Sequence, residues 1–159
     1  MVDFEVFYKT AERMFHGSDL YQVEGDEDYV FKYAPTSAVY FIPFILLPIA
    51  ISKVIYWLIL CLLIVEGYYL SGKLYLSESM NSNPKLNNTI LFIAFAVVFI
   101  HIERELVLGQ INWVLLVLYL WMALAYINGK PKQLALSLAV SIFIKPFGLI
   151  FIPYLILKR

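Results

Sequence analysis

The sequence predicts an all-α membrane protein that crosses the bilayer several times and carries a polar N-terminal segment. Hydrophobic residues make up 62% of its 159 residues, and the mean hydropathy is +0.77, whereas a soluble domain is about half apolar. Charge is also unevenly spread, because residues 1–33 hold eight acids and three bases and residues 34–159 hold four acids and nine bases. We therefore expect an external acidic loop over 1–33 and a transmembrane helical region over 34–159.

The composition also excludes some classes of partner and bond. Basic residues are scattered between apolar runs rather than clustered, so no nucleic-acid partner is expected. The single cysteine, Cys61, cannot form a disulfide within the chain.

The first element is predicted to be an amphipathic helix over residues 4–15. Its apolar residues recur at helical spacing: Phe4, Phe7, Tyr8, Ala11, Met14 and Phe15. Asp3 is expected to cap the N-terminus of this helix, and Gly17 to supply its left-handed C-terminal residue. The helix either lies in the membrane interface or packs on protein, and residues 18–32 follow as an acidic loop.

The membrane region is predicted to contain five hydrophobic segments. They cover residues 34–51, 54–76, 88–102, 110–128 and 133–157. A spanning helix needs about 20 apolar residues, which the last two segments supply. The first is marginal, the third is short, and the second reaches full length only by including charged and glycine residues. Tilted, broken, half-spanning or re-entrant helices are therefore expected, since irregular backbone is tolerated where protein shields it.

The orientation predicted from charge contains a conflict. Basic residues favour the cytoplasmic side, so the acidic segment is expected outside and Lys53 inside. The pairs Lys130 and Lys132, and Lys158 and Arg159, also favour the inside. Five simple spans cannot satisfy all of these preferences. Either 133–157 is re-entrant, turning back at Lys145-Pro146, or 88–102 does not cross.

Lys145 and Pro146 together form the sharpest candidate site. A lysine at the bilayer centre costs about 2.5–3.5 kcal/mol on insertion scales, and such a residue is a functional candidate. Pro146 opens the helix and gives the ammonium a route to water or to a phosphate. The alternative is a lysine that snorkels at a kink.

Other polar residues have both structural and chemical interpretations. Asp3 is either a helix cap or a general base at the membrane surface. Gln110 and Asn112 either cap a helix and bond its neighbour or bind a sugar. The cluster His101, Glu103, Arg104 and Glu105 matches no strong metal signature and is expected to form a solvated interfacial loop. Arg104 could instead pair with a phosphate.

The order of these motifs resembles glycosyltransferase family 87. The resemblance rests on "DFEVFYKTAERMFHGSDLY", "FKYAPTSAVYFIPFILLP" and the segment from "LGQINW" to "IKPFGLIFIPYLILKR". The shared features are an Asp-Phe before an aromatic helix, a Gly-x-x-Leu-Tyr, a Tyr-x-Pro, a Gly-Gln-x-Asn and a Lys-Pro. The resemblance implies the GT-C fold of multi-pass enzymes that are similar to polyprenyl-phosphate-mannose-dependent mannosyltransferases.

The resemblance also implies a reaction and roles for residues. A hexose, with mannose expected, would pass from a polyprenyl-phosphate carrier to a cell-envelope glycan or glycolipid on the external face of the plasma membrane. Asp3 matches the essential acid and would act as the general base. Candidates for substrate contact are Lys145, Arg104, Gln110, Asn112 and Tyr33. No cofactor is expected, and no metal is demanded because the leaving group is a monophosphate.

The resemblance is to the N-terminal portion of the family. Its members normally have a transmembrane helix before the Asp-Phe and several helices after the Lys-Pro. The chain is therefore expected to be a fragment, or to work with a second chain that supplies the missing helices. Two other functions stay open: a non-catalytic family member or assembly subunit, and a transporter or flippase fragment in which Lys145 gates a substrate.

Overall fold

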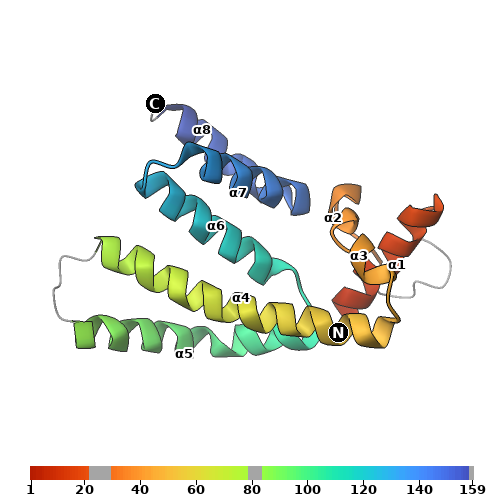
Figure 1. Ribbon diagram of the computed structural model, residues 1–159, viewed down its shortest axis with the longest axis horizontal. Helices are drawn as coiled ribbons and strands as arrows, with labels where there is room; N and C mark the ends of the chain where they lie inside the picture. Colours follow the sequence, from red (N-terminus) through yellow and green to blue (C-terminus); the bar gives the residue numbers. More distant parts are fainter. Residues whose placement is uncertain (22–29, 79–83, 158–159) are drawn as a thin grey trace.

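The computed structural model describes residues 1–21, 30–78 and 84–157, and these ranges contain helices, turns and no strand. This confirms the all-α class (Figure 1). The helices are α1 (Val2–His16), α2 (Pro35–Val39), α3 (Ile42–Ile45), α4 (Ile49–Glu78), α5 (Pro84–Leu108), α6 (Asn112–Ile127), α7 (Pro131–Ile144), the 3₁₀ helix η1 (Pro146–Ile150) and α8 (Phe151–Leu157). Most of the predicted acidic loop, residues 22–29, lies outside the described ranges, as do Lys158 and Arg159.

The long helices α4 and α5 run side by side, α6 packs on α4, and α7 packs on α6 (Figure 1). Within the described ranges, α4 is the one helix long and apolar enough to cross a membrane, over Ile49–Ser77. Helices α6 and α7, which lie in the two segments expected to be long enough to span, are apolar but shorter, so several crossings stay a prediction. The most exposed apolar side chains of α4 and α5 are Leu62, Val65, Phe92, Val97 and Ile100. Apolar surface on this scale is typical of a face that meets lipid or further protein.

The segment 34–51 is not one helix. Prolines divide it: Pro35 begins α2, Pro43 lies in the first turn of α3, and Pro48 directly precedes α4. Proline is tolerated in a first helical turn but not in a helix interior. The segment therefore forms two short helices that pack against α1 at the N-terminal end of α4.

Helix α1 packs on protein through its apolar face. Phe4 and Phe7 are 0% and 1% exposed, and Phe7 stacks on Phe41 with ring centroids 4.4 Å apart. Phe4 also contacts Tyr56 of α4, at 4.8 Å between centroids. These contacts favour the packed helix over one whose apolar face lies in the membrane interface.

The C-terminal end of α1 agrees with the sequence prediction, and the N-terminal end does not. Gly17 ends the helix as expected, with φ at 70° and its N–H bonded to the carbonyl of Met14. The predicted cap role of Asp3 is wrong, because the helix begins at Val2 and Met1 is the capping position. Asp3 instead lies in the first turn, where a carboxylate interacts favourably with the helix dipole.

The predicted loop over His101, Glu103, Arg104 and Glu105 is also wrong. Helix α5 runs on to Leu108, so all four residues are helical. The segment predicted at 88–102 is therefore part of a 25-residue helix.

The break at Lys145-Pro146 is confirmed, and the chain turns back there. Helix α7 ends at Ile144, and Lys145 has an extended backbone. The ring of Tyr154 in α8 lies 6.1 Å from that of Tyr126 near the end of α6, so α8 returns to the end at which α7 begins (Figure 1). Gly148 permits this return, because a Cβ there would lie 2.6 Å from Ser141 Oγ in α7.

Lys53 lies at the same end of the molecule as α1. Its Nζ donates to Glu5 Oε1 at 2.6 Å, and this hydrogen bond lowers the pKa of the Glu5 carboxyl. The prediction that Lys53 and the acidic segment lie on opposite sides of the membrane is therefore wrong. The physical reason is that the proline-divided segment before Lys53 does not span.

Candidate active site

The candidate site lies where α5 ends, α6 begins and the first turn of α1 covers the connection. Gly109 makes the turn possible, because its φ is 72° and its N–H bonds to the carbonyl of Glu105 at 2.9 Å. A Cβ on Gly109 would lie 3.0 Å from Phe4 Cβ and 3.2 Å from Met1 Cβ. Glycine here therefore allows both the left-handed backbone and the close approach of α1.

Asn112 is the centre of a hydrogen-bond network. Its Nδ2 donates to Glu105 Oε1 at 2.9 Å and to Gln110 Oε1 at 2.8 Å. Its Oδ1 accepts from Lys145 Nζ at 2.6 Å. Both hydrogens of Asn112 Nδ2 and its Oδ1 therefore have partners, so the network fixes the orientation of the Asn112 amide.

Lys145 enters the site from the break after α7. Its ammonium lies 4.7 Å from the centre of the Tyr33 ring, a cation–π contact. Thr36 of α2 donates to the carbonyl of Phe143 at 2.7 Å and so fixes α2 against the end of α7. The sequence pattern Lys-Pro thus has a geometric meaning: the broken helix aims the ammonium at Asn112 and Tyr33.

Two carboxylates influence this ammonium. Asp3 and Glu105 both attract the Lys145 ammonium electrostatically, although the hydrogen-bond partner of Lys145 is the neutral amide of Asn112. Burial raises the pKa of Tyr33, and the negative charges of Asp3 and Glu105 raise it further. Tyr33 is therefore a neutral hydroxyl donor and acceptor at physiological pH.

The structure brings five of the six predicted site residues together. Those five are Asp3, Tyr33, Gln110, Asn112 and Lys145. Arg104 lies elsewhere: it is exposed and lines a separate hollow with His101 and Glu103 on the side of α5. Adjacent helical residues point about 100° apart, so Arg104 and Glu105 face different surroundings.

Sequence reasoning missed Glu105 as a site residue. Its Oε1 accepts from Asn112, while its Oε2 is buried and has no hydrogen-bond partner. A buried oxygen without a donor is costly and is therefore a natural acceptor for a ligand hydroxyl. The available signal is the spacing Glu105, Gly109, Asn112, because it places the acid in the last turn of one helix and the amide at the start of the next, on either side of a glycine turn.

The described residues contain no group of three or more His, Cys, Asp or Glu side chains that could hold a metal ion. The expectation that the reaction needs no metal and no cofactor stays a prediction.

Comparison with known families gives one result. The sequence model of glycosyltransferase family 87 matches residues 31–159, which confirms the resemblance over most of the chain. No curated protein and no solved structure matches the chain. Asp3 precedes the matched range, so the case for its role rests on its position beside Tyr33 and Lys145.

Proposed function

The chain belongs to glycosyltransferase family 87, and we propose that it transfers a hexose, mannose being the expected sugar, from a polyprenyl-phosphate carrier to a cell-envelope glycan or glycolipid. The family implies a membrane glycosyltransferase with a sugar donor and an acceptor. The identity of the carrier, the sugar and the acceptor is our proposal. The observation that supports it is the meeting of a carboxylate, an ammonium and two amides at one site.

Asp3 is the general base of the proposed reaction. The acceptor oxygen forms a bond to the anomeric carbon, the bond from that carbon to the phosphate oxygen breaks, and the acceptor proton moves to the Asp3 carboxylate. Asp3 is half-buried in the first turn of α1, so its carboxylate stays open to an acceptor. A positioned base of this kind contributes about 10²–10⁴-fold in rate.

Lys145 stabilises the leaving phosphate. Negative charge grows on the phosphate oxygens as the anomeric bond breaks, and a fixed cation lowers the energy of that transition state. Among the described residues, no carboxylate forms an ion pair with Lys145 within 4.0 Å, and its direct partner is the Asn112 amide. Its positive charge is therefore available to a ligand.

The sugar is bound by the groups beside the ammonium. The Gln110 amide nitrogen and the Tyr33 hydroxyl supply donors, and the second lone pair of Asn112 Oδ1 supplies an acceptor. The buried Oε2 of Glu105 supplies a further acceptor. A site that hydrogen-bonds hydroxyl groups rejects analogues that lack them, because its buried polar groups would be left unpaired. This is the basis for selecting a hexose.

The experiment compares Asp3→Asn with Lys145→Met in the intact gene product, using labelled polyprenyl-phosphate mannose as donor. Asp3→Asn should lower transfer by about 10²–10⁴-fold and leave donor binding unchanged. Lys145→Met should weaken donor binding while easing membrane insertion, because the buried charge is removed.

The matched control is Lys132→Met, which removes an exposed lysine from the far end of the molecule. If Asp3→Asn transferred sugar at the wild-type rate, Asp3 would not be the general base. If Lys145→Met bound the donor with wild-type affinity, Lys145 would only snorkel and would not bind the phosphate. Folded wild-type protein that binds the donor but transfers no sugar would favour the non-catalytic alternative.

A further inference from the structure

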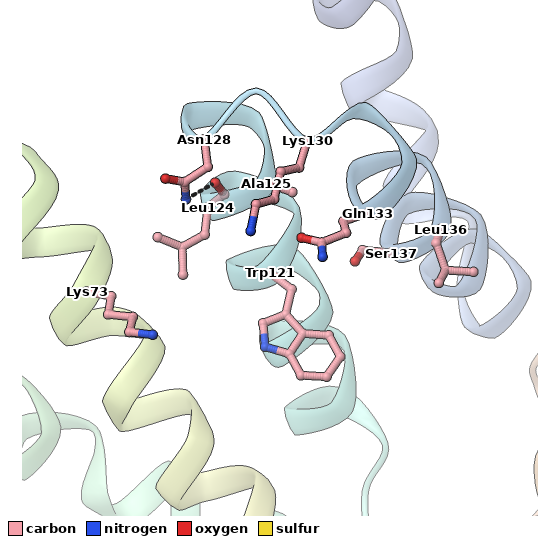
Figure 2. Close-up of a pocket in the computed structure, with 9 residues that line it drawn as sticks. All are labelled: Lys73, Trp121, Leu124, Ala125, Asn128, Lys130, Gln133, Leu136 and Ser137. Carbon is pink, nitrogen blue, oxygen red and sulfur yellow. Dashed lines mark hydrogen bonds between the residues drawn. The ribbon is translucent and has the colours of Figure 1, made fainter.

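A second pocket lies at the other end of the helices, between α4, α6 and the start of α7. It encloses about 480 Å³, a volume within the range of small-molecule sites. Figure 2 shows its lining, which consists of Lys73, Trp121, Leu124, Ala125, Asn128, Lys130, Gln133, Leu136 and Ser137. None of these residues belongs to the candidate active site.

The charge of this pocket is positive. Two of its nine lining residues are lysines and none is an acid. The ammonium groups of Lys73 and Lys130 both point into the space in front of Trp121 (Figure 2). Lys73 contacts the Tyr69 ring at 4.4 Å, and no carboxylate among the described residues pairs with either lysine.

The remaining lining is partly polar and partly apolar. The amide of Gln133 and the hydroxyl of Ser137 face the same space as the lysines (Figure 2). Leu124 and Leu136 form apolar walls. The indole of Trp121 is held by its hydrogen bond to Glu66 Oε1, at 3.2 Å. An anionic head and an apolar tail could therefore both be accommodated.

The depth of the pocket fits one boundary of a bilayer. Lys53 and Lys73 are twenty residues apart on α4, which corresponds to about 30 Å of helix. The hydrocarbon core of a bilayer is also about 30 Å thick. Lys53 lies beside α1, so the pocket is at the opposite membrane surface from the candidate active site.

We propose that this pocket binds the phosphate headgroup of an anionic phospholipid in the leaflet opposite the candidate active site. Lysine is a common point-charge partner of phosphate, and basic pockets between transmembrane helices recognise lipid headgroups. The two ammonium groups contact the phosphate, Gln133 and Ser137 bond its ester or glycerol oxygens, and the acyl chains follow Leu124 and Leu136. This inference does not depend on the proposed glycosyl transfer.

Binding to the full chain in detergent tests the proposal, with short-chain phosphatidylglycerol, short-chain phosphatidylcholine and inorganic phosphate as separate probes. Phosphatidylglycerol should bind most tightly. The double variant Lys73→Gln/Lys130→Gln should weaken that binding about 30-fold, as expected for two lysines near an anionic headgroup. The matched control is Lys9→Gln/Lys32→Gln, which removes two exposed lysines outside the pocket and should bind as the wild type does.

A second variant keeps the test decisive if the double variant does not fold. Gln133→Glu leaves both lysines in place but adds a carboxylate to the pocket, so it should also weaken phosphatidylglycerol binding. Equal affinity for phosphatidylglycerol and phosphatidylcholine would overturn the proposal, as would equal binding by the pocket and control variants. If inorganic phosphate bound as tightly as phosphatidylglycerol, the pocket would be a site for free phosphate and not for a lipid headgroup.

Discussion

At the scale of single residues, Glu105 changes the chemistry of the candidate site most. Asp3 and Lys145 are the proposed base and cation, but neither accounts for the orientation of the Asn112 amide. Glu105 accepts one hydrogen of Asn112 Nδ2 at 2.9 Å and so turns Asn112 Oδ1 toward Lys145. Glu105 is therefore a positioning residue for the ammonium, in addition to offering its own free oxygen.

We expect Glu105→Gln to lower sugar transfer by about 10–100-fold, because a hydrogen bond to a charged group is worth about 1.5–3 kcal/mol. The KM for the lipid donor should rise, since the position of Lys145 would be less well defined. Steady-state kinetics in reconstituted vesicles would measure both quantities.

The control for this prediction is Glu103→Gln, two residues earlier on an exposed face of α5. It should behave as the wild type does. A role limited to folding would lower the melting temperature of Glu105→Gln and leave the KM unchanged, and Glu105→Asp should restore part of the donor affinity.

At the scale of elements, the turn between α5 and α6 determines whether α1 can cover the site. Gly109 combines a left-handed backbone with contacts to Met1 and Phe4. Gly129, in the turn between α6 and α7, also has a positive φ, 63°, but a Cβ there would meet nothing within 4 Å. Substituting each glycine in turn therefore distinguishes the cost of a left-handed backbone, present at both positions, from the cost of a clash with α1, present only at Gly109.

Gly129→Ala is expected to lower the free energy of unfolding by about 1–2 kcal/mol, the cost of a left-handed alanine. Gly109→Ala should cost about 1–3 kcal/mol more, because its methyl group overpacks against α1. Gly109→Ala should also reduce sugar transfer, since Asp3 moves with α1. Denaturant unfolding in detergent would measure the stabilities, and equal losses would contradict the close contact with α1.

At the scale of the whole molecule, the fold separates charged residues between the two ends of α4. Lys53 and Glu5 lie at one end of α4, while Lys73 and Lys130 lie at the other. The end of α5 and the break after α7 return to the end near α1 (Figure 1). If the acidic segment is external, Lys73, Lys130 and Lys132 are internal, as the positive-inside tendency favours.

This topology predicts opposite labelling of two engineered cysteines in a Cys61→Ser background. A membrane-impermeant maleimide added to intact cells should label Lys9→Cys and leave Lys132→Cys unlabelled until the membrane is permeabilised. Both lysines are exposed, so accessibility in the folded protein is matched. Labelling of both sites in intact cells would contradict an odd number of crossings between them.

Several features could be predicted from the sequence because they depend on local chemistry. The high apolar content required helices whose backbone groups are satisfied within each segment. Proline removes a backbone donor and clashes with the preceding turn, so the break at Pro146 was predictable. Gly17 was identified as a helix end for a similarly local reason.

Other features depended on how the helices are rotated and packed. Arg104 and Glu105 are neighbours in sequence, yet only Glu105 faces Asn112. The charge pattern places Lys53 on the wrong side because it treats the segment 34–51 as a span. Prolines instead divide this segment into α2 and α3, which pack against α1.

The sequence by itself determined that this chain is helical, apolar, broken at Lys145-Pro146 and a member of a glycosyltransferase family. Only the tertiary structure decided that Glu105, and not Arg104, lies in the candidate site and that Lys73 and Lys130 line a second pocket at the far end. The physical reason is that hydropathy and proline act on the chain locally. The meeting of side chains from α1, α5, α6 and α7 depends instead on long-range packing around glycine contacts.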